Sequence, residues 1–243
     1  MTDDVATARR ALPLLDLTEL SNDCEAALVT DLCVRAVDPL GKVAAVCVWP
    51  EFVALATDSL ANTGVRIATV VNFPKGEDTI ERVRSETSAA LASGADEIDL
   101  VLPWRVFLTG DEGSAREMVA AVRESVGAST LKVILETGMY PDQIAVARAS
   151  RLAIDAGADF LKTSTGKASV SATSDAMTTM MTTIRDAGRT VGIKPSGGIR
   201  TIEQASVYLD IVDSIMGPEW ATPHTFRFGT SALHDAIIHT LGH

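Results

Sequence analysis

The sequence predicts an α/β protein, a single-domain (β/α)8 barrel of the TIM type, and three observations support this prediction. Eight short apolar runs rich in β-forming residues recur at fairly even intervals along the 243 residues. The segments between most of these runs carry apolar residues at helical spacing. Two junctions from a helix into a strand also repeat each other, ASGADEIDL at 92–100 and DAGADFLKT at 155–163. Strands that alternate with helices form a parallel sheet with right-handed crossovers, and eight such units close into a barrel.

The eight strands are expected in chain order, separated by helices. They are placed at residues 43–49, 66–73, 97–102, 131–137, 160–164, 191–194, 213–217 and 226–231. Residues 1–40 precede these runs and are interpreted as a helical N-terminal extension against the barrel. The alternative fold is a doubly wound sheet, which normally has a glycine-rich phosphate turn after its first strand. The run at 43–49 is instead followed by Pro50 and Glu51. No linker or low-complexity tract divides the chain, so residues 1–243 are interpreted as one domain.

The helical pattern is clearest in the segment GEDTIERVRSETSAALASG. One face of the expected helix carries Ile80, Val83, Thr87, Ala90 and Leu91, and a glycine at position 94 supplies a stop at its C-terminal end. In both repeated junctions a glycine ends the helix, Ala-Asp follows, and an apolar strand begins. This repetition favours a repeated αβ unit over a boundary between unrelated domains.

The composition excludes several classes of function. Acidic residues outnumber basic ones by 32 to 21, the formal net charge is −11, and no run rich in Lys or Arg occurs, so no nucleic-acid partner is expected. Apolar stretches are broken well short of the ~20 residues that a membrane span needs, and the N-terminus MTDDVATARR has no signal-peptide core. Cys24, Cys33 and Cys47 do not resemble a disulfide framework. We therefore expect a cytoplasmic protein without a membrane partner, which binds any anionic ligand through a local positive patch.

Charged residues within apolar strands indicate where chemistry would occur. Active sites of these barrels lie at the carboxyl ends of the strands, and Lys162 and Lys194 occupy equivalent places near two such ends. Asp99 lies within EIDLVLP, where a buried carboxylate is costly unless it is paired, and a purely structural ion pair is the alternative. Two ammonium groups that face one cavity repel, which lowers the pKa of at least one, and a neutral lysine adds to carbonyl groups. Together the three residues favour lysine-to-carbonyl addition. Glu136, near the end of the run at 131–137, faces either the same mouth or the surface.

Glycine-rich turns follow three of the expected strands and predict phosphate binding. They are Thr165-Gly166-Lys167, Ser196-Gly197-Gly198 and Gly229-Thr230-Ser231. Glycine lets a ligand approach the backbone closely, so that exposed N–H groups bind phosphate oxygens. Each turn alone is more often an ordinary loop, but three turns at one end of a barrel favour a phosphorylated substrate.

Metal chemistry is not expected from the distribution of histidines. All four histidines lie in the final twenty residues and none lies on the first seven expected strands. An aldol mechanism based on an amine is therefore favoured over one based on a metal. Cys47 either lines the same mouth or is buried and inert, which is the more usual state of a cysteine.

Several sequence blocks, in order over nearly the whole chain, carry a resemblance to a known family. They are LDLTEL (15–20), AVCVWP (45–50), RIATVVNFPKG (66–76), GADEIDLVLPWR (94–105), LKVILETG (131–138), GADFLKTSTGK (157–167), TVGIKPSGGIR (190–200) and RFGTSAL (227–233). They closely resemble the deoxyribose-phosphate aldolases, class I Schiff-base aldolases on a (β/α)8 barrel that need no metal or organic cofactor. The resemblance implies reversible cleavage of 2-deoxy-D-ribose 5-phosphate to glyceraldehyde 3-phosphate and acetaldehyde.

The resemblance also implies roles for individual residues. Lys162 matches the lysine that forms the imine, and Asp99 and Lys194 match its proton-transfer partners. Asp16 matches a carboxylate that helps to hold the second lysine, and Cys47 is placed beside it as a supporting residue. The phosphate-binding positions of the family match Lys167, Gly197, Gly198 and Ser231.

The sequence departs from some relatives at two places. Ala232 stands where they have a second serine, which removes one hydroxyl from the phosphate site. The chain stops at Leu241-Gly242-His243 and lacks their tail ending in tyrosine, so proton transfer assisted by such a tail is not expected. Two other functions are retained as alternatives, another class I phosphosugar aldolase or transaldolase, and a non-catalytic phosphosugar-binding barrel that acts as a sensor. A homodimer is considered as the assembly.

Overall fold

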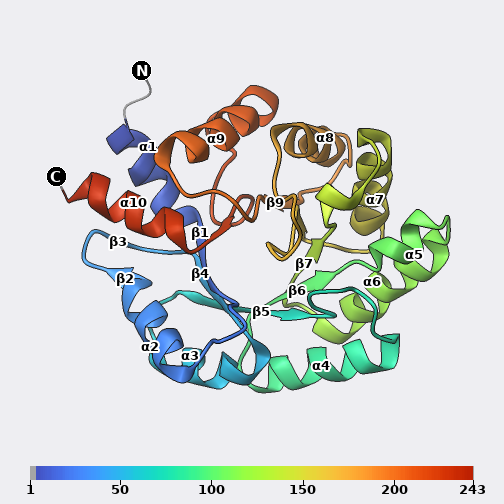
Figure 1. The fold of residues 1–243 in the computed structure, drawn as a ribbon, viewed down its shortest axis with the longest axis horizontal. Helices are drawn as coiled ribbons and strands as arrows, with labels where there is room; N and C mark the ends of the chain where they lie inside the picture. The colour runs from blue at the N-terminus through green and yellow to red at the C-terminus, as the bar shows by residue number, and fades with distance from the viewer. Residues whose placement is uncertain (1–3, 243) are drawn as a thin grey trace.

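The structure, a computed structural model, describes residues 4–242. Within that range one sheet of eight parallel strands has the order β10-β1-β4-β5-β6-β7-β8-β9. Isolated parallel bridges between Ile193 and Phe226 and between Ser196 and Gly229 join its two edges, so the sheet closes. Figure 1 shows the strands at the centre with the helices around them. The predicted (β/α)8 barrel is confirmed.

The strands of the barrel are short, and most of their residues are buried. Their bounds are β1 (Leu15–Glu19), β4 (Ala45–Val48), β5 (Arg66–Val71), β6 (Glu97–Val101), β7 (Thr130–Ile134), β8 (Phe160–Lys162), β9 (Gly192–Lys194) and β10 (Phe228–Thr230). A small antiparallel hairpin, β2 (Val37–Asp38) with β3 (Gly41–Lys42), lies outside the barrel sheet. Every barrel strand except β1 coincides with one of the expected runs.

One expected strand is wrong. Residues 213–217 form the end of a helix, α9 (Ile202–Met216), and the glycine that follows it. A short apolar run cannot be distinguished from a buried helical segment by periodicity alone. Here a capping box formed by Thr201 and Gln204 starts the helix, and Leu209 and Val212 are buried along it. The helix therefore continues to Met216, and this segment contributes no strand.

The strand that completes the set of eight is β1, the first strand in chain order. It lies within the segment that was predicted to be a helical extension. It pairs with β10 on one side and with β4 on the other. Leu15 and Leu17 belong to the main apolar core, whereas Asp16 between them contacts charged residues inside the barrel. A strand with an inward carboxylate and only two buried leucines does not form an apolar run, and this is why the pattern missed it.

The helices surround the barrel, and within residues 4–242 ten α-helices and three short 3-10 helices are present. Their bounds are α1 (Asp4–Ala11), α2 (Ala26–Arg35), α3 (Val53–Ser59), α4 (Ile80–Ala92), α5 (Trp104–Leu108), α6 (Glu112–Val126), α7 (Gln143–Asp155), α8 (Ser174–Arg185), α9, α10 (Ala232–Leu241), η1 (Leu12–Leu14), η2 (Pro50–Phe52) and η3 (Thr137–Met139). The helix α1 packs against α9 and α10 (Figure 1), and Arg10 forms a 2.5 Å ion pair with Asp213. Within residues 4–40, α1 and η1 precede the strand β1, and α2 follows it.

The apolar core lies between the barrel and its helices. The outward side chains of the strands and the inward faces of the helices form one large cluster of buried residues. In α4 the expected face is confirmed, because Val83, Thr87 and Ala90 are buried and Gly94 follows with a φ of 104°. The interior of the barrel differs in kind, since charged side chains are fully buried there. Burying charge is unfavourable unless the charges are paired, so the pairing inside the barrel is what positions the site.

Candidate active site

Asp99, on β6, is the point at which three lysines from three other strands meet. The Nζ atoms of Lys162 on β8 and Lys194 on β9 each lie 2.8 Å from its Oδ2 atom. The Nζ atom of Lys132 on β7 lies 2.9 Å from its Oδ1 atom. The parallel register sets Lys162 directly opposite Lys194. The structure therefore brings together Asp99, Lys162 and Lys194, the three residues predicted to be catalytic.

The charged side chains around Asp99 keep one another ionised. Burial would raise the pKa of Asp99, but the ammonium groups of Lys132, Lys162 and Lys194 outweigh it and hold the pKa of Asp99 well below its usual range. Burial would lower the pKa of Lys194, but the carboxylates of Asp16 and Asp99 outweigh burial and raise it. Lys194 is thus a persistent cation beside Lys162. The expectation that one of these two lysines has a lowered pKa does not hold for Lys194.

A second set of buried charges extends this group along the barrel, and sequence reasoning missed most of it. Lys132 lies 2.5 Å from Glu97 Oε2, and Arg227 donates hydrogen bonds to both Glu97 and Asp16. Asp16 Oδ2 also lies 2.6 Å from Lys194 Nζ, as the predicted supporting role of Asp16 requires. The signal that identified Asp99, a charge within an apolar run, was present at Lys132 too. Arg227, between two phenylalanines in FRFG, carries the same signal.

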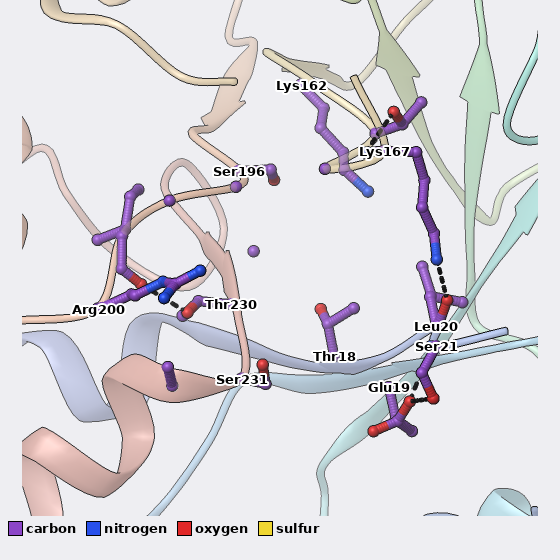
Figure 2. Close-up of a pocket in the computed structure, with 17 residues that line it drawn as sticks. Thr18, Glu19, Leu20, Ser21, Lys162, Lys167, Ser196, Arg200, Thr230 and Ser231 are labelled. Atoms are coloured by element: carbon purple, nitrogen blue, oxygen red, sulfur yellow. Dashed lines mark hydrogen bonds between the residues drawn. The ribbon is translucent and has the colours of Figure 1, made fainter. Parts of the chain in front are cut away.

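A cavity of about 320 Å³ opens beside Lys162 at the carboxyl ends of the strands. Figure 2 shows Lys162 and Lys167 entering it from one side and the loop from Ser196 to Arg200 from another. It is lined by Lys162 and by every residue predicted to bind phosphate, namely Thr165, Gly166, Lys167, Gly197, Gly198, Gly229 and Ser231. Ser196 lines it as part of the predicted turn Ser196-Gly197-Gly198, and Thr18 and Arg200 line it without having been predicted. Three cations and one carboxylate, Glu19, line this cavity, so a local positive patch exists on an acidic protein.

Glycine is needed at the positions around the cavity for two different physical reasons. Gly166 and Gly198 have φ angles of 76° and 80°, and open space lies where a Cβ atom would be. Glycine is needed at these two positions for the left-handed backbone conformation. At Gly229 a Cβ atom would lie only 2.1 Å from Ser196 Oγ and 2.9 Å from Lys194 Cε. Glycine therefore lets β10 approach the segment after β9, where the barrel closes.

The loop after β8 is held on both sides of the cavity. Lys167 Nζ donates hydrogen bonds to Leu20 O at 2.6 Å and to Asn22 Oδ1 at 3.2 Å, which uses two of its three N–H donors. The hydroxyl of Thr165 donates to Glu136 Oε2 at 2.5 Å, and its backbone N–H donates to Oε1. The single hydroxyl proton of Thr165 is therefore committed to Glu136. Thr165 shapes the loop, and its predicted place in the phosphate site stays a prediction. Glu136 is buried, and it lines another cavity with Trp104 and Arg105 instead of the cavity beside Lys162.

The first turn of α10 also borders the cavity. Ser231 immediately precedes this helix, and Ala232 is its first residue; both line the cavity. The N-terminal end of a helix presents N–H groups and a partial positive charge, which favours an anion. The end of the cavity that lies away from Lys162 is therefore suited to a phosphate group.

Cys47 lies outside the cavity. Cys47, on β4, is buried against Leu20, Ala68 and Val70 and is not among the residues that line the cavity. Burial raises the pKa of its thiol, which disfavours a reactive thiolate. Across residues 4–242, no group of three or more His, Cys, Asp or Glu side chains is placed to hold a metal ion. None of the helices in that range is long and apolar enough to span a membrane.

Comparisons with known proteins agree with this geometry. The model of the DeoC/LacD aldolase family matches residues 10–226. A curated deoxyribose-phosphate aldolase of Agrobacterium fabrum is 49% identical over 247 residues, which cover 99% of this chain and 95% of that protein. The apo crystal structure of a candidate deoxyribose-phosphate aldolase from Toxoplasma gondii ME49 has a TM-score of 0.91 at 27% identity and covers 100% of this chain and 98% of its own. A tetrameric deoxyribose phosphate aldolase from Aeropyrum pernix has a TM-score of 0.77 at 22% identity, covers 100% and 93% of the two chains, and shows the fold alone.

Proposed function

The chain belongs to the DeoC/LacD aldolase family, and we propose that it is a class I deoxyribose-phosphate aldolase in which Lys162 forms the Schiff base. It reversibly cleaves 2-deoxy-D-ribose 5-phosphate to D-glyceraldehyde 3-phosphate and acetaldehyde. The observation that carries the assignment of Lys162 is its position. Its amine lines the cavity and touches the carboxylate that also holds Lys194.

The proposed reaction begins at the amine of Lys162. The amine adds to the C1 aldehyde of the open-chain sugar, and loss of water leaves a protonated imine. The imine accepts the electron pair of the C2–C3 bond while the C3 hydroxyl loses its proton. D-Glyceraldehyde 3-phosphate then departs and an enamine of acetaldehyde remains on Lys162. Protonation of the enamine carbon and addition of water release acetaldehyde and regenerate the amine.

Asp99 and Lys194 are the proposed proton-transfer pair. Both lie next to Lys162, and their charges are firmly set, because the pKa of Asp99 is lowered and that of Lys194 is raised. A carboxylate with a low pKa holds a proton only briefly, and efficient acid–base catalysis requires a group that titrates near the working pH. We therefore assign a water molecule as the carrier between the C3 hydroxyl and this pair, which orients the water and stabilises the charge that develops.

The phosphate of the substrate is assigned to the end of the cavity away from Lys162. The loop from Ser196 to Arg200 and Ser231 at the start of α10 lie at that end, whereas Lys167 enters from the side of Lys162. Lys162 and Lys167 are only five residues apart, on either side of the turn at Gly166. We assign Lys162 to the carbonyl end of one short sugar phosphate, and Lys167 to a contact with its phosphate from the same side of the cavity.

Borohydride trapping tests the proposal. Reduction in the presence of acetaldehyde should fix a stable adduct, and peptide mapping should place it on Lys162. A Lys162→Met variant should give no adduct. An adduct on Lys194 or Lys167 of the unaltered protein, or none at all, would contradict the assignment.

Assays with other substrates distinguish the alternatives. If a ketose phosphate is cleaved faster than 2-deoxy-D-ribose 5-phosphate, the protein is a different phosphosugar aldolase. If phosphosugars bind but no adduct forms, it is a binding barrel without catalysis. The intact set of Asp99, Lys162 and Lys194 favours the aldolase.

The cellular context and the assembly are part of the proposal. Cys24, Cys33 and Cys47 are all free thiols, which supports a reducing compartment such as the cytoplasm. We propose a homodimer as the assembly, for which analytical ultracentrifugation should give twice the 25.6 kDa mass of one chain. The tetramer of the Aeropyrum pernix protein is the alternative that the measurement would reveal.

A further inference from the structure

The interior of the barrel holds more positive than negative charge. Among the residues that the structure describes, seven ionisable side chains form one connected set of ion pairs, each at most 5% exposed. We call them the barrel charge cluster, and its members are Asp16, Glu97, Asp99, Lys132, Lys162, Lys194 and Arg227. With every group ionised, four cations face three carboxylates. One buried positive charge is then uncompensated, which is costly in an environment without water.

Lys162 is the member of the cluster that can lose a proton and thereby remove the uncompensated positive charge. Arg227 cannot lose its proton at any ordinary pH. Lys132 lies within 4 Å of three carboxylates, at 3.4, 2.5 and 2.9 Å, and Lys194 lies near two, at 2.6 and 2.8 Å. Within residues 4–242, Lys162 is paired with Asp99 alone, and it also borders the cavity. Loss of its proton leaves three cations and three carboxylates, and it produces the neutral amine that imine formation needs.

We propose that Glu97 and Arg227 are positioning residues that set the charge balance of this cluster and thereby the pH at which Lys162 becomes a free amine. The proposal rests on the proposed function, because it takes Lys162 as the residue that forms the Schiff base. Neither residue needs to contact the substrate. Each acts through the shared carboxylates and ammonium groups that lie between it and Lys162.

The location of Glu97 and Arg227 makes this role separable from substrate binding. Both line a second cavity of about 480 Å³, and neither lines the cavity beside Lys162. Glu97 begins β6 and Arg227 immediately precedes β10, so the pair lies at the amino ends of the strands. The active-site cavity lies at the carboxyl ends. Changes at the pair therefore alter the charge of the cluster and leave the substrate contacts in place.

Other charged groups surround both ends of the cluster and stay constant in the test. Glu97 and Arg227 share their cavity with the side chains of Lys42, Arg66, Asp159 and His224. Lys162 faces Asp99 and Lys194 within the barrel, and the thiol of Cys47 interacts electrostatically with its ammonium group. The other charged residues that line its cavity are Glu19, Lys167 and Arg200. These groups are present in every variant below, so they do not contribute to a difference between variants.

The test measures the acid limb of the pH profile of kcat/KM, which reports the free enzyme. Arg227→Gln leaves three cations facing three carboxylates, so Lys162 keeps its proton longer and the midpoint of the limb should rise by about one pH unit. Glu97→Gln leaves two carboxylates against four cations, and the midpoint should fall by about the same amount. A shift of this order is expected for one unit charge at about 10 Å with an effective dielectric constant near 20.

The double variant and a charge-conserving variant are the controls. Glu97→Gln with Arg227→Gln restores one surplus positive charge, so the midpoint should return to that of the unaltered protein. Arg227→Lys keeps the charge and should leave the midpoint unmoved even if it lowers activity. KM for the substrate should change less than about twofold throughout, because the substrate cavity is untouched.

Two results would overturn the inference. The single variants could move the midpoint in the same direction, or they could lower kcat/KM equally at every pH, as a purely structural role would do. Circular dichroism checks folding, and if Arg227→Gln does not fold, the nearly isosteric Glu97→Gln still tests the sign of the shift. Borohydride trapping is followed over the same pH range. If no Lys162 adduct forms in the unaltered protein, the proposed function fails; if the adduct forms with an unshifted midpoint in the variants, only this inference fails.

Discussion

At the scale of single residues, the site depends on one carboxylate that is shared. Asp99 accepts hydrogen bonds from Lys132, Lys162 and Lys194, so no one lysine can move or change charge without affecting the others. Such a group of mutually satisfied charges is rigid, because removing one partner leaves another buried charge unpaired. The rigid part of the site is thus the part proposed to meet the carbonyl end of the substrate, whereas the proposed phosphate end is built from loops.

Ala232 gives a prediction at this scale. It lines the cavity next to Ser231 at the first position of α10. The variant Ala232→Ser adds a hydroxyl there, and a hydrogen bond to a charged group contributes about 1.5–3 kcal/mol. KM for 2-deoxy-D-ribose 5-phosphate should therefore fall by at least about tenfold, with kcat changed little. Steady-state kinetics with unphosphorylated 2-deoxyribose is the control, and an equal change for both sugars would show that the hydroxyl does not act on the phosphate.

At the scale of elements, the two repeated junctions perform the same structural task. Gly94 and Gly157 both have a φ of 104°, and each is followed two residues later by an aspartate. The carboxylate of Asp96 accepts the N–H of Ile67 at 2.9 Å, and that of Asp159 accepts the N–H of Leu131 at 2.8 Å. Each aspartate thereby ties the start of its own strand to the start of the preceding one. The echo seen in the sequence is therefore a repeated device for setting strand register.

Removal of one of these carboxylates should destabilise the barrel. Asp159→Ala loses the bonds to Leu131 N and to Arg123 Nη1, and each such bond is typically worth about 1–3 kcal/mol when one partner is left without the other. We expect the free energy of unfolding to fall by about 2 kcal/mol, as measured by urea denaturation. Asp159→Asn keeps an acceptor for Leu131 N and should lose less. Equal losses for the two variants would contradict the assigned role of the backbone hydrogen bond.

At the scale of the whole molecule, the buried charges link stability to pH at both ends of the scale. The pKa values of Asp16 and Asp99 are lowered, because the cations around them outweigh burial. Those of Lys132 and Lys194 are raised, because the carboxylates around them outweigh burial. The carboxylates thus contribute stability that is present above their unfolded pKa of about 4 and is lost as pH falls through the lower folded value. The lysines contribute stability that is present below their unfolded pKa of about 10.4 and is lost as pH rises through the higher folded value.

The stability that these four groups contribute should be lost only towards the extremes of pH. We expect their contribution to the free energy of unfolding to decline below about pH 4 and above about pH 10.5. Urea denaturation across this range measures it. A loss on the acid side that begins near neutral pH would show that Asp16 and Asp99 do not dominate the acid limb.

The sequence by itself determined the class of fold, the set of Asp99, Lys162 and Lys194, and the glycine turns. These features are local: a strand is a short apolar run, a turn is a glycine at a particular place, and Lys162 or Lys194 is conspicuous because its neighbours are apolar. The tertiary structure alone decided that β1 completes the barrel, that residues 213–217 are helical, and that Thr165 is committed to Glu136. It also decided the charge balance, because Glu97 and Arg227 are 130 residues apart and meet only when the closed sheet sets their register. Pairing across a barrel depends on that closure, and no local pattern encodes it.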